Sequence, residues 1–445
     1  MTIDDNEIEI NIALEQAIEA IGYKKNNILY FFGRIFQYAD EPSFFSYNSQ
    51  LNNSLTDKTP ADGSASGFSF FSQKLAVLKC LLEALERYAL KHYDKKDVIF
   101  STTDKLDKSF VDPTTIASFS DKQRKENKNL KLNVNGLYGW ILGKKLPSLE
   151  DIYIPAQLIY FSYRRQLGEG LIRLPISTGA ASGTANSAAI YRGLCEAIER
   201  DAFMITYLNK LPRSKIPLHK SKNTKIKKII EMVDNCNLQI NSFDISTDIG
   251  VYVFLTTIYD GTGISSAISV GMKGGLDPIE TLLGSMQEAF HSRAWIRNKK
   301  DQFTGKKSDL MKPPDLLERA LLWSSLDSVK NLDFLLNSTK ETVNIDDYKD
   351  KSNNSSAKDL SKTIELLRDR GYESYFVDIT PDLPSIKNTK FKVVMTIVPE
   401  LQPLYLNEQY QYLGGARLYE IPVKLGYLKK SNNQSNLHKF PHPFL

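Results

Sequence analysis

The sequence predicts a mixed α+β protein in which helices cover antiparallel sheets. Three observations support this fold class. Long helical patterns alternate with strand patterns along the chain, neighbouring strand patterns are joined by glycine or proline turns, and the composition is globular. The 445 residues are 42% hydrophobic and 24% charged, so the chain can form one large core or two modest ones.

The expected elements follow from hydrophobic periodicity and from the positions of glycine and proline. Helices are expected at 71–92, 187–209, 278–297 and 358–370, and strands within 136–163 and at 251–259, 265–270, 375–379 and 391–398. A small-residue loop is expected at 179–186. The Asn, Ser, Lys and Asp-rich stretch 337–361 is expected to be a mobile loop. We divide the chain into an N-terminal segment (1–62), a main domain (63–428) and a C-terminal arm (429–445).

Charge and cysteine content narrow the function classes. The formal net charge is only +5, and the basic residues are scattered or lie in polar stretches such as 122–131, which argues against a nucleic-acid-binding stripe. The three cysteines have no C-x-x-C spacing, so neither a zinc knuckle nor a disulfide framework is indicated. The N-terminus is acidic, and no apolar run is long enough to span a membrane. A cytoplasmic protein is expected.

The stretch L-L-E-A-L-E-R, residues 81–87, returns almost unchanged as L-C-E-A-I-E-R at 194–200. On a helix Glu83, Glu86 and Arg87 share one face, with an apolar stripe elsewhere on the helix. By itself this helix could be an ordinary surface helix stabilised by an i, i+4 ion pair. An internal duplication is disfavoured, because no other pair of segments matches at the same offset.

The second copy is harder to explain as a surface helix. Apolar residues surround Glu196, Glu199 and Arg200 on most of the helix circumference, which is typical of a buried helix. One arginine per copy leaves two surplus negative charges if the two stripes face each other. Unpaired carboxylates in a low-dielectric site are costly, and divalent cations relieve that cost. The two copies therefore predict two sides of one Mg²⁺–phosphate site.

Two further segments could contribute to such a site. The third helix contains Q-E-A-F-H-S-R at 287–293, although a solvated helix face explains this segment equally well. The loop S-T-G-A-A-S-G-T-A-N at 177–186 offers backbone N–H groups and a helix N-terminus, which attract phosphate, but a plain connection would look the same. Neither a P-loop nor a G-x-G-x-x-G motif after a strand is present.

Taken together, these segments resemble the YcaO-domain family, and within it the D-component cyclodehydratases of thiazole/oxazole-modified peptide biosynthesis, the streptolysin-type maturases. The resemblance covers the chain from about residue 27 to the end. It rests on the following motifs, in order: G-F-S-F-F-S-Q-K-L-A-V-L-K-C-L-L-E-A-L-E-R-Y, S-T-G-A-A-S-G-T-A-N-S-A-A-I-Y-R-G-L-C-E-A-I-E-R-D-A, Q-E-A-F-H-S-R-A-W, F-V-D-I-T-P-D-L-P, I-V-P-E-L-Q-P-L, G-G-A-R-L-Y-E-I-P and P-H-P-F-L.

The resemblance implies ATP-dependent activation of a peptide amide. A Cys, Ser or Thr side chain of a precursor peptide attacks the preceding carbonyl, ATP phosphorylates the hemiorthoamide oxygen, and phosphate leaves to give a thiazoline or oxazoline. The implied cofactors are ATP and Mg²⁺. The implied Mg²⁺ ligands are Glu83, Glu86, Glu196 and Glu199, and the implied ATP contacts are Ser72, Arg87, Ser182, Thr184, Asn186, Arg200, Gln287, Glu288 and Arg293.

The sequence departs from the family at two places. Where the family has G-N-T-x-x-E-A, Thr184 replaces the usual Asn and Ala188 the usual Glu. Asn186 could replace the former, but nothing replaces the acid. The tail ends P-H-P-F-L where azoline-forming members often end P-x-P-x-P, and a disordered terminus is the plain alternative.

The resemblance further implies a catalytic tail. Pro441 and Pro443 would stiffen an extended arm that inserts the carboxylate of Leu445 as a base. Removing the last five residues is therefore expected to impair cyclisation and to spare folding, because few core contacts would depend on so extended an arm.

Two other functions are kept open. A YcaO relative could use another nucleophile and form a backbone thioamide or an amidine, although the proline-containing tail favours azolines. The loss of the acid at Ala188 could instead indicate an impaired scaffold that only binds peptide or a partner, although all four paired acids are retained.

The expected partners are a precursor peptide, a separate E1-like leader-binding protein, an FMN-dependent azoline dehydrogenase and a second copy of the chain in a homodimer. Residues 1–50 are too few for an E1-like module of their own. A separate partner would raise the local concentration of a weakly bound core peptide.

Overall fold

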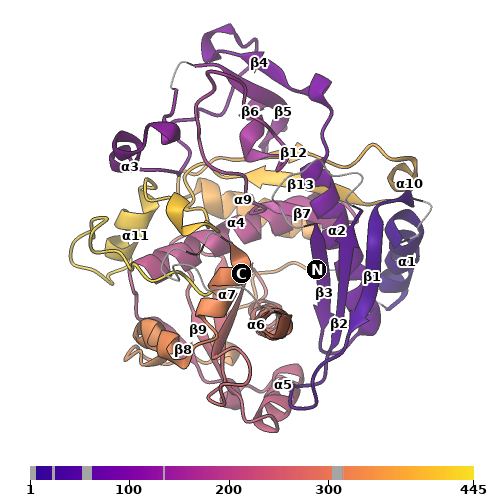
Figure 1. The fold of residues 1–445 in the computed structure, drawn as a ribbon, viewed down its shortest axis with the longest axis vertical. Coiled ribbons are helices and arrows are strands. Elements are labelled where there is room, and N and C mark those ends of the chain that lie inside the picture. Colours follow the sequence, from indigo (N-terminus) through magenta and orange to yellow (C-terminus); the bar gives the residue numbers. More distant parts are fainter. Residues whose placement is uncertain are drawn as a thin grey trace. The chain divides into compact units, whose positions relative to one another are not determined.

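A computed structural model describes residues 7–22, 26–52, 63–133, 136–302, 313 and 315–444 of the chain (Figure 1). It divides the chain into two compact parts, which are treated separately here. The first part contains residues 1–36, 45–197 and 353–401, and the second contains residues 37–44, 198–352 and 402–445. Among the described residues, no helix is both long enough and apolar enough to cross a membrane.

The first part contains two antiparallel sheets. One sheet has the strand order β1-β2-β3, and the other has the order β4-β5-β12-β13-β7, with β6 paired to β5. Its strands are β1 (Leu29–Ile35), β2 (Phe45–Leu51), β3 (Ser64–Ser69), β4 (Ile99–Ser101), β5 (Tyr138–Leu146), β6 (Asp151–Pro155), β7 (Ala180–Gly183), β12 (Ser374–Asp378) and β13 (Lys392–Ile397). Its helices are α1 (Glu7–Ala17), α2 (Gln73–Lys91), α3 (Asp121–Glu126), α9 (Ser356–Arg368) and α10 (Pro384–Lys387).

The second part contains one four-stranded antiparallel sheet, of order β11-β10-β9-β8. Its strands are β8 (Ser214–Ile216), β9 (Gln239–Asp244), β10 (Tyr252–Tyr259) and β11 (Ile268–Gly275). Its helices are α5 (Thr224–Asp234), α6 (Pro278–Gln302), α7 (Leu316–Leu322), α8 (Asp333–Leu336) and α11 (Arg417–Lys424). The long helix α4 (Asn186–Leu208) begins in the first part and ends in the second.

Helix α2 packs on β3 and β2 in the first part. It begins after Ser72, whose hydroxyl accepts a hydrogen bond from the Leu75 N–H (3.2 Å) and so caps the helix. The helix can approach β3 closely because residue 67 is glycine. A Cβ at that position would lie 2.0 Å from the Ala76 carbonyl oxygen.

Helix α6 packs on β11 and β10 in the second part in a similar way. The Asp277 carboxylate accepts from the Ile279 and Glu280 N–H groups (2.8 and 3.0 Å) at its N-terminus. Residue 271 of β11 is glycine, and a Cβ there would lie 2.1 Å from the Ala289 nitrogen. In each part, therefore, a glycine lets a helix lie directly on a strand.

The predicted fold class, mixed α+β with antiparallel sheets covered by helices, is confirmed, because every strand pair above is antiparallel. The expected loop at 179–186 is wrong in part, since residues 180–183 form β7 and pair with β13. Residues 337–355 form no long helix or strand, as predicted, but 337–352 are held by the rest of the second part, and the expected loop is wrong at its end because 356–361 begin α9. Ile345 is buried, and the Val343 and Lys351 N–H groups donate to the carbonyls of Lys215 and Leu276.

Candidate functional site

The glutamates of α2 are held by donors from neighbouring elements of the first part. One Glu83 oxygen accepts from the Arg87 guanidinium (3.1 Å), and the other accepts from the Ser66 N–H of β3 (3.0 Å). Ser66 precedes Gly67, the glycine that brings α2 onto β3. The same close contact therefore orients the carboxylate.

Glu86 is held by β7. One of its oxygens accepts from both the backbone N–H and the hydroxyl of Ser182, each at 2.7 Å. Burial raises the pKa of Glu86 to about 7; the Ser182 hydroxyl opposes this shift and the negative charge of Glu83 adds to it. A carboxyl with so high a pKa gains strongly from a nearby cation.

The Arg87 guanidinium interacts electrostatically with acids of α2 and with Glu196 of α4. Burial lowers the pKa of its guanidinium, but Glu83, Glu86 and Glu196 outweigh that effect and raise it. Glu196, in the first half of α4, thus lies within electrostatic reach of the arginine of α2. Next to it, Arg192 donates to the Ser182 carbonyl (2.6 Å), and its charge acts on Glu86.

A second group of charges lies in the second part of the chain. Glu199 is buried, pairs with Arg200, and accepts a hydrogen bond from the Gly274 N–H at the end of β11 (2.9 Å). Burial raises the pKa of Glu199 to about 7. The cations Arg200 and Lys273 oppose the shift, and Glu288 adds to it.

Helix α6 supplies Glu288, whose carboxylate accepts from the Met272 N–H of β11 (2.6 Å). Its neighbour Gln287 is partly buried on the same helix. Met272 follows Gly271, so the contact of α6 with β11 orients Glu288 much as the contact of α2 with β3 orients Glu83.

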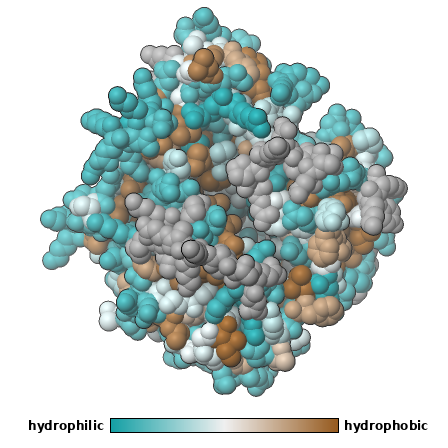
Figure 2. All heavy atoms as spheres, viewed as in Figure 1, coloured by the Kyte–Doolittle hydropathy of each residue, from teal (hydrophilic) through white to brown (hydrophobic). Residues whose placement is uncertain are grey.

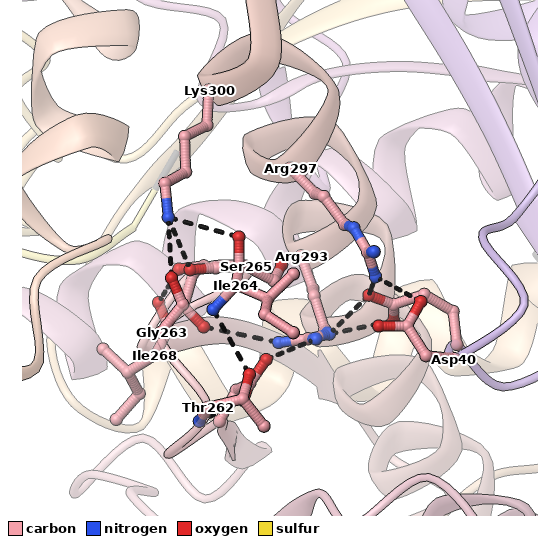
Figure 3. Close-up of polar contacts among 12 residues, drawn as sticks. Asp40, Thr262, Gly263, Ile264, Ser265, Ile268, Arg293, Arg297 and Lys300 are labelled. Atoms are coloured by element: carbon pink, nitrogen blue, oxygen red, sulfur yellow. Dashed lines mark hydrogen bonds and ion pairs between the residues drawn. The ribbon is translucent and has the colours of Figure 1, made fainter.

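Arg293, predicted to contact ATP, lies in a buried ion-pair network (Figure 3). It donates to Glu41 (2.9 Å) and to Asp260 (2.8 Å), and Arg297 on the next turn pairs with Glu41 and Asp40. The guanidinium of Arg293 thus has two carboxylate partners, and the pairs that Glu41 makes with Arg293 and Arg297 hold segment 37–44 on α6.

The predicted phosphate loop contains both buried and exposed site residues. Ser182 is buried in β7 and donates to Glu86, whereas Thr184 and Asn186 are exposed at the start of α4. Ser72, which is also predicted to contact ATP, caps the N-terminus of α2. Ala188, where the family has an acid, is buried, and a Cβ added to Gly183 would come within 3.2 Å of its Cβ.

The C-terminal arm corrects an expectation. Predicted to be an extended arm with few core contacts, it is instead buried at its end: His442 and Phe444 are 0% and 1% exposed. The Tyr207 hydroxyl and the Trp323 indole N–H both donate to the Pro441 carbonyl at 3.0 Å. Aromatic residues make the tail a packing element, so its removal cannot be neutral for folding. Pro441 and Pro443 are buried with it, and Leu445 lies outside the described residues.

The tail also reaches a predicted site residue. The ring of Phe444 lies under the Arg200 guanidinium, 4.1 Å from ring centroid to Cζ, and beside Phe203. Arg200 is therefore fixed by Glu199 on one side and by an aromatic face on the other. The sequence analysis missed this contact, together with the roles of Ser66, Lys273 and Gly274. The two glycines that follow Lys273 were an available signal for a backbone approach.

The donor set fits Mg²⁺ and phosphate. Carboxylates are the preferred protein ligands of Mg²⁺, and arginine and lysine neutralise phosphoryl oxygens. Among the described residues, no three His, Cys, Asp or Glu side chains are grouped as a metal site. Two glutamates with pKa values near 7 show that the fold holds carboxyl groups where a cation would stabilise them.

Acids beside arginine and lysine side chains are what a Mg²⁺–phosphate site needs. The model of the family described as YcaO cyclodehydratase, ATP- and Mg²⁺-binding, matches residues 71–402. The chain belongs to this family of ATP- and Mg²⁺-binding proteins.

Known proteins show the same fold. A heterocyclase solved in complex with substrate and cofactor has a TM-score of 0.80 at 20% identity, and the match covers 97% of this chain and 57% of that one. YcaO from Methanopyrus kandleri, bound with AMPPCP and Mg²⁺, has a TM-score of 0.62 at 14% identity, over 88% and 91% of the two chains. An uncharacterized protein from Methanothermobacter thermautotrophicus is 24% identical over 331 residues, 74% of this chain and 79% of the relative. The chain thus spans little more than half of the heterocyclase.

Proposed function

We propose that the protein is an ATP- and Mg²⁺-dependent cyclodehydratase that forms azolines in a ribosomally made precursor peptide. The single observation that carries the proposal is the retention of both E-x-x-E-R copies, each with a second glutamate whose pKa is raised to about 7 and which accepts a strand N–H. A scaffold that only bound peptide would have no use for two such costly carboxyl groups. The family membership supplies the reaction class.

In this proposal a Cys, Ser or Thr side chain of the peptide attacks the preceding carbonyl carbon. The amide oxygen receives the γ-phosphoryl group of ATP and leaves as phosphate, so each ring forms with loss of one water and conversion of one ATP to ADP. Bound Mg²⁺ would neutralise the phosphate charge and polarise the phosphoryl group.

The chain's own residues would bind and orient. We assign Glu83, Glu86, Glu196 and Glu199 as Mg²⁺ ligands. We assign the phosphate and nucleotide contacts to Arg87, Arg200, Gln287, Glu288, Ser72, Ser182, Thr184 and Asn186. Arg293 is assigned a nucleotide contact as well, although its guanidinium already pairs with Glu41 and Asp260. Arg87 and Arg200 are held by neighbouring acids, so they meet the phosphate without losing much side-chain freedom.

The tail is proposed to position Arg200 through Phe444 and to act near the reacting amide through Leu445. A leader-binding partner is proposed to deliver the peptide, because the heterocyclase of similar fold is a longer protein and was solved with substrate. We also propose that an FMN-dependent azoline dehydrogenase is a partner and that the protein is cytoplasmic.

The experiment that tests the function is mass spectrometry of a Cys/Ser/Thr-containing precursor peptide incubated with the protein, its leader-binding partner, Mg²⁺ and ATP. Azoline formation predicts the loss of one water per ring, in step with ATP consumed, at internal Cys, Ser or Thr. Replacement of oxygen by sulfur would show a thioamide instead. Peptide binding without peptide-stimulated ATP hydrolysis would show a scaffold.

A further inference from the structure

The two E-x-x-E-R copies share one further residue type. A cation stands four residues before the first glutamate of each copy, Lys79 before Glu83 and Arg192 before Glu196. The common pattern is therefore K/R-x-x-x-E-x-x-E-R. Because residues at i and i+4 lie on one side of a helix, Arg192 belongs to the same stripe of α4 as Glu196, a proposed Mg²⁺ ligand.

Both cations donate to strands of the first part. The Lys79 ammonium donates to the Phe68 carbonyl of β3 (3.3 Å). The Arg192 guanidinium donates to the Ser182 carbonyl of β7 (2.6 Å). Ser182 in turn donates its N–H and its hydroxyl to Glu86, each at 2.7 Å. A single residue therefore joins Arg192 to another proposed Mg²⁺ ligand.

Close packing of α4 brings Arg192 to β7. The next residue of the helix is Gly193, and a Cβ there would lie 2.5 Å from the Gly179 carbonyl oxygen and 2.8 Å from the Thr396 hydroxyl oxygen. Gly179 directly precedes β7, and Thr396 belongs to β13, which pairs with β7. Residue 193 makes this close contact, so a change of the Arg192 side chain should leave it in place.

The Arg192 guanidinium has fewer partners than a buried arginine needs. An arginine side chain has five N–H donors, and buried donors are normally paired. Arg192 is half-buried, its Nε is buried without a hydrogen bond, and Ser182 offers it a neutral carbonyl. Arg87 and Arg200, by contrast, each pair with a glutamate of their own helix. Burial lowers the pKa of Arg192, and the charge of Glu86 opposes that shift.

A nucleotide phosphate is the anion that suits this guanidinium. Two N–H donors of an arginine can bind two phosphate oxygens at once. Three glutamates already act on Arg87 in the first part, so negative charge there exceeds what one arginine balances, and a lone carboxylate would be repelled. A phosphate that arrives with Mg²⁺ brings the cation that neutralises these acids.

We propose that Arg192 is a further nucleotide-binding residue, which donates to a phosphate group of Mg–ATP beside Glu86. This role rests on the proposed function, since it requires ATP to bind near the glutamates of α2. Two arginines of the first part, Arg87 and Arg192, then contact the phosphates. A purely structural tie between α4 and β7 is the alternative, and the experiments below separate the two.

The first test is isothermal titration calorimetry of ATP with Mg²⁺. Arg192→Gln should bind ATP about 10–100-fold more weakly than the wild type, because a charge-assisted hydrogen bond to phosphate is lost. Arg192→Lys keeps the charge but not the two-pronged geometry, so binding should weaken by about 3–10-fold. Unchanged affinity in Arg192→Gln would overturn this role and leave the proposed function standing.

The matched control is Lys125→Gln, which removes an exposed cation from α3 in the same part of the chain. Figure 2 shows hydrophilic side chains at the surface over α3, at the upper left. This variant should bind ATP like the wild type. Melting curves without nucleotide accompany each titration. If Arg192→Gln melts below the wild type, Arg192→Lys decides, and wild-type affinity in that variant would overturn the role.

The second test repeats the titrations in EDTA, without Mg²⁺. A direct phosphate contact predicts a similar fold loss for Arg192→Gln with and without the metal. A loss seen only with Mg²⁺ would show that Arg192 acts through Ser182 and Glu86 on the metal, and it would overturn the phosphate contact. A wild type that binds no ATP under either condition would overturn the proposed function, and this role with it.

Discussion

Two helix-on-sheet contacts, one in each part of the molecule, are built alike. In the first part α2 lies on β3 at Gly67, and the neighbouring Ser66 N–H binds Glu83. In the second part α6 lies on β11 at Gly271, and the neighbouring Met272 N–H binds Glu288. In both contacts a glycine allows the helix to lie close to the strand. The backbone N–H of a residue next to that glycine orients an acid of the helix.

The two contacts differ in the charges described around the acid. Arg87 belongs to α2 itself and pairs with Glu83, one turn earlier. Glu288 of α6 is held by the Met272 N–H and acts on Glu199, whose nearby cations are Lys273 of β11 and Arg200 of α4. A repeated sequence therefore need not mark a repeated structure. The E-x-x-E-R copies are on α2 and α4, whereas the helix that resembles α2 in its packing is α6.

The largest expected effect concerns the buried acid in each part. Glu86→Gln and Glu199→Gln should each lower Mg²⁺-dependent ATP turnover by about 10²–10³-fold, because each removes a ligand charge with little change of shape. The measurement is ATP hydrolysis with peptide and partner present, beside circular dichroism. The control is Glu280→Gln, an exposed acid of α6. Loss of ATP turnover in only one of the two variants would show that Glu86 and Glu199 do not have equivalent roles.

Much of this arrangement could be predicted from sequence. The helices at 73–91, 186–208 and 278–302 follow from periodicity, and the charge surplus of two E-x-x-E-R copies pointed to a cation site. The Glu83–Arg87 pair was predicted, but the strand N–H groups that bind Glu83, Glu86 and Glu199 could not be, because they depend on how the helices pack on the strands. The burial of the tail was missed because prolines suggest extension, while burial depends on aromatic partners such as Tyr207 and Trp323.

The second prediction concerns the two glycines. Gly67→Ala and Gly271→Ala should each destabilise the protein by about 2–4 kcal/mol, because the new Cβ would meet helix backbone atoms that cannot move aside. Urea unfolding measures the change. Gly22→Ala is the control, since its nearest neighbours would be 3.9 Å away. A small effect at either glycine would show that the helix there is not held against its strand.

The third prediction uses the raised pKa of Glu199. Its folded pKa of about 7 exceeds the ordinary value of 4.5, so the folded protein binds the extra proton. Its contribution to stability is therefore complete below pH 4.5 and is lost as the pH rises through 7. Without Mg²⁺ or ATP, the free energy of unfolding of Glu199→Gln should rise by about 1–3 kcal/mol relative to that of the wild type as the pH increases from 5 to 8. Equal pH slopes in urea unfolding would contradict the shift, and Glu280→Gln should follow the wild type.

The smallest effect concerns the ring under Arg200. Phe444→Leu keeps an apolar side chain but removes the aromatic face, and it should lower turnover by about 2–30-fold, as a lost cation–π contact of about 0.5–2 kcal/mol implies. A fall in kcat with an unchanged melting temperature would support positioning of Arg200. The control is Phe440→Leu, a tail ring that packs against Trp323 instead. Equal losses in both variants would assign the tail a packing role alone.

The central claim is that glutamates of α2 and α4 hold the Mg²⁺ of Mg–ATP. The most direct measurement is a crystal structure with a non-hydrolysable ATP analogue and Mn²⁺ in place of Mg²⁺, in which anomalous scattering locates the metal. The account predicts metal within about 2.0–2.3 Å of carboxylate oxygens of Glu83, Glu86, Glu196 and Glu199, with Glu86 and Glu199 turned from Ser182 and Gly274 as needed. Metal bound elsewhere, with Glu86 still on Ser182 and Glu199 still on Gly274 alone, would contradict it.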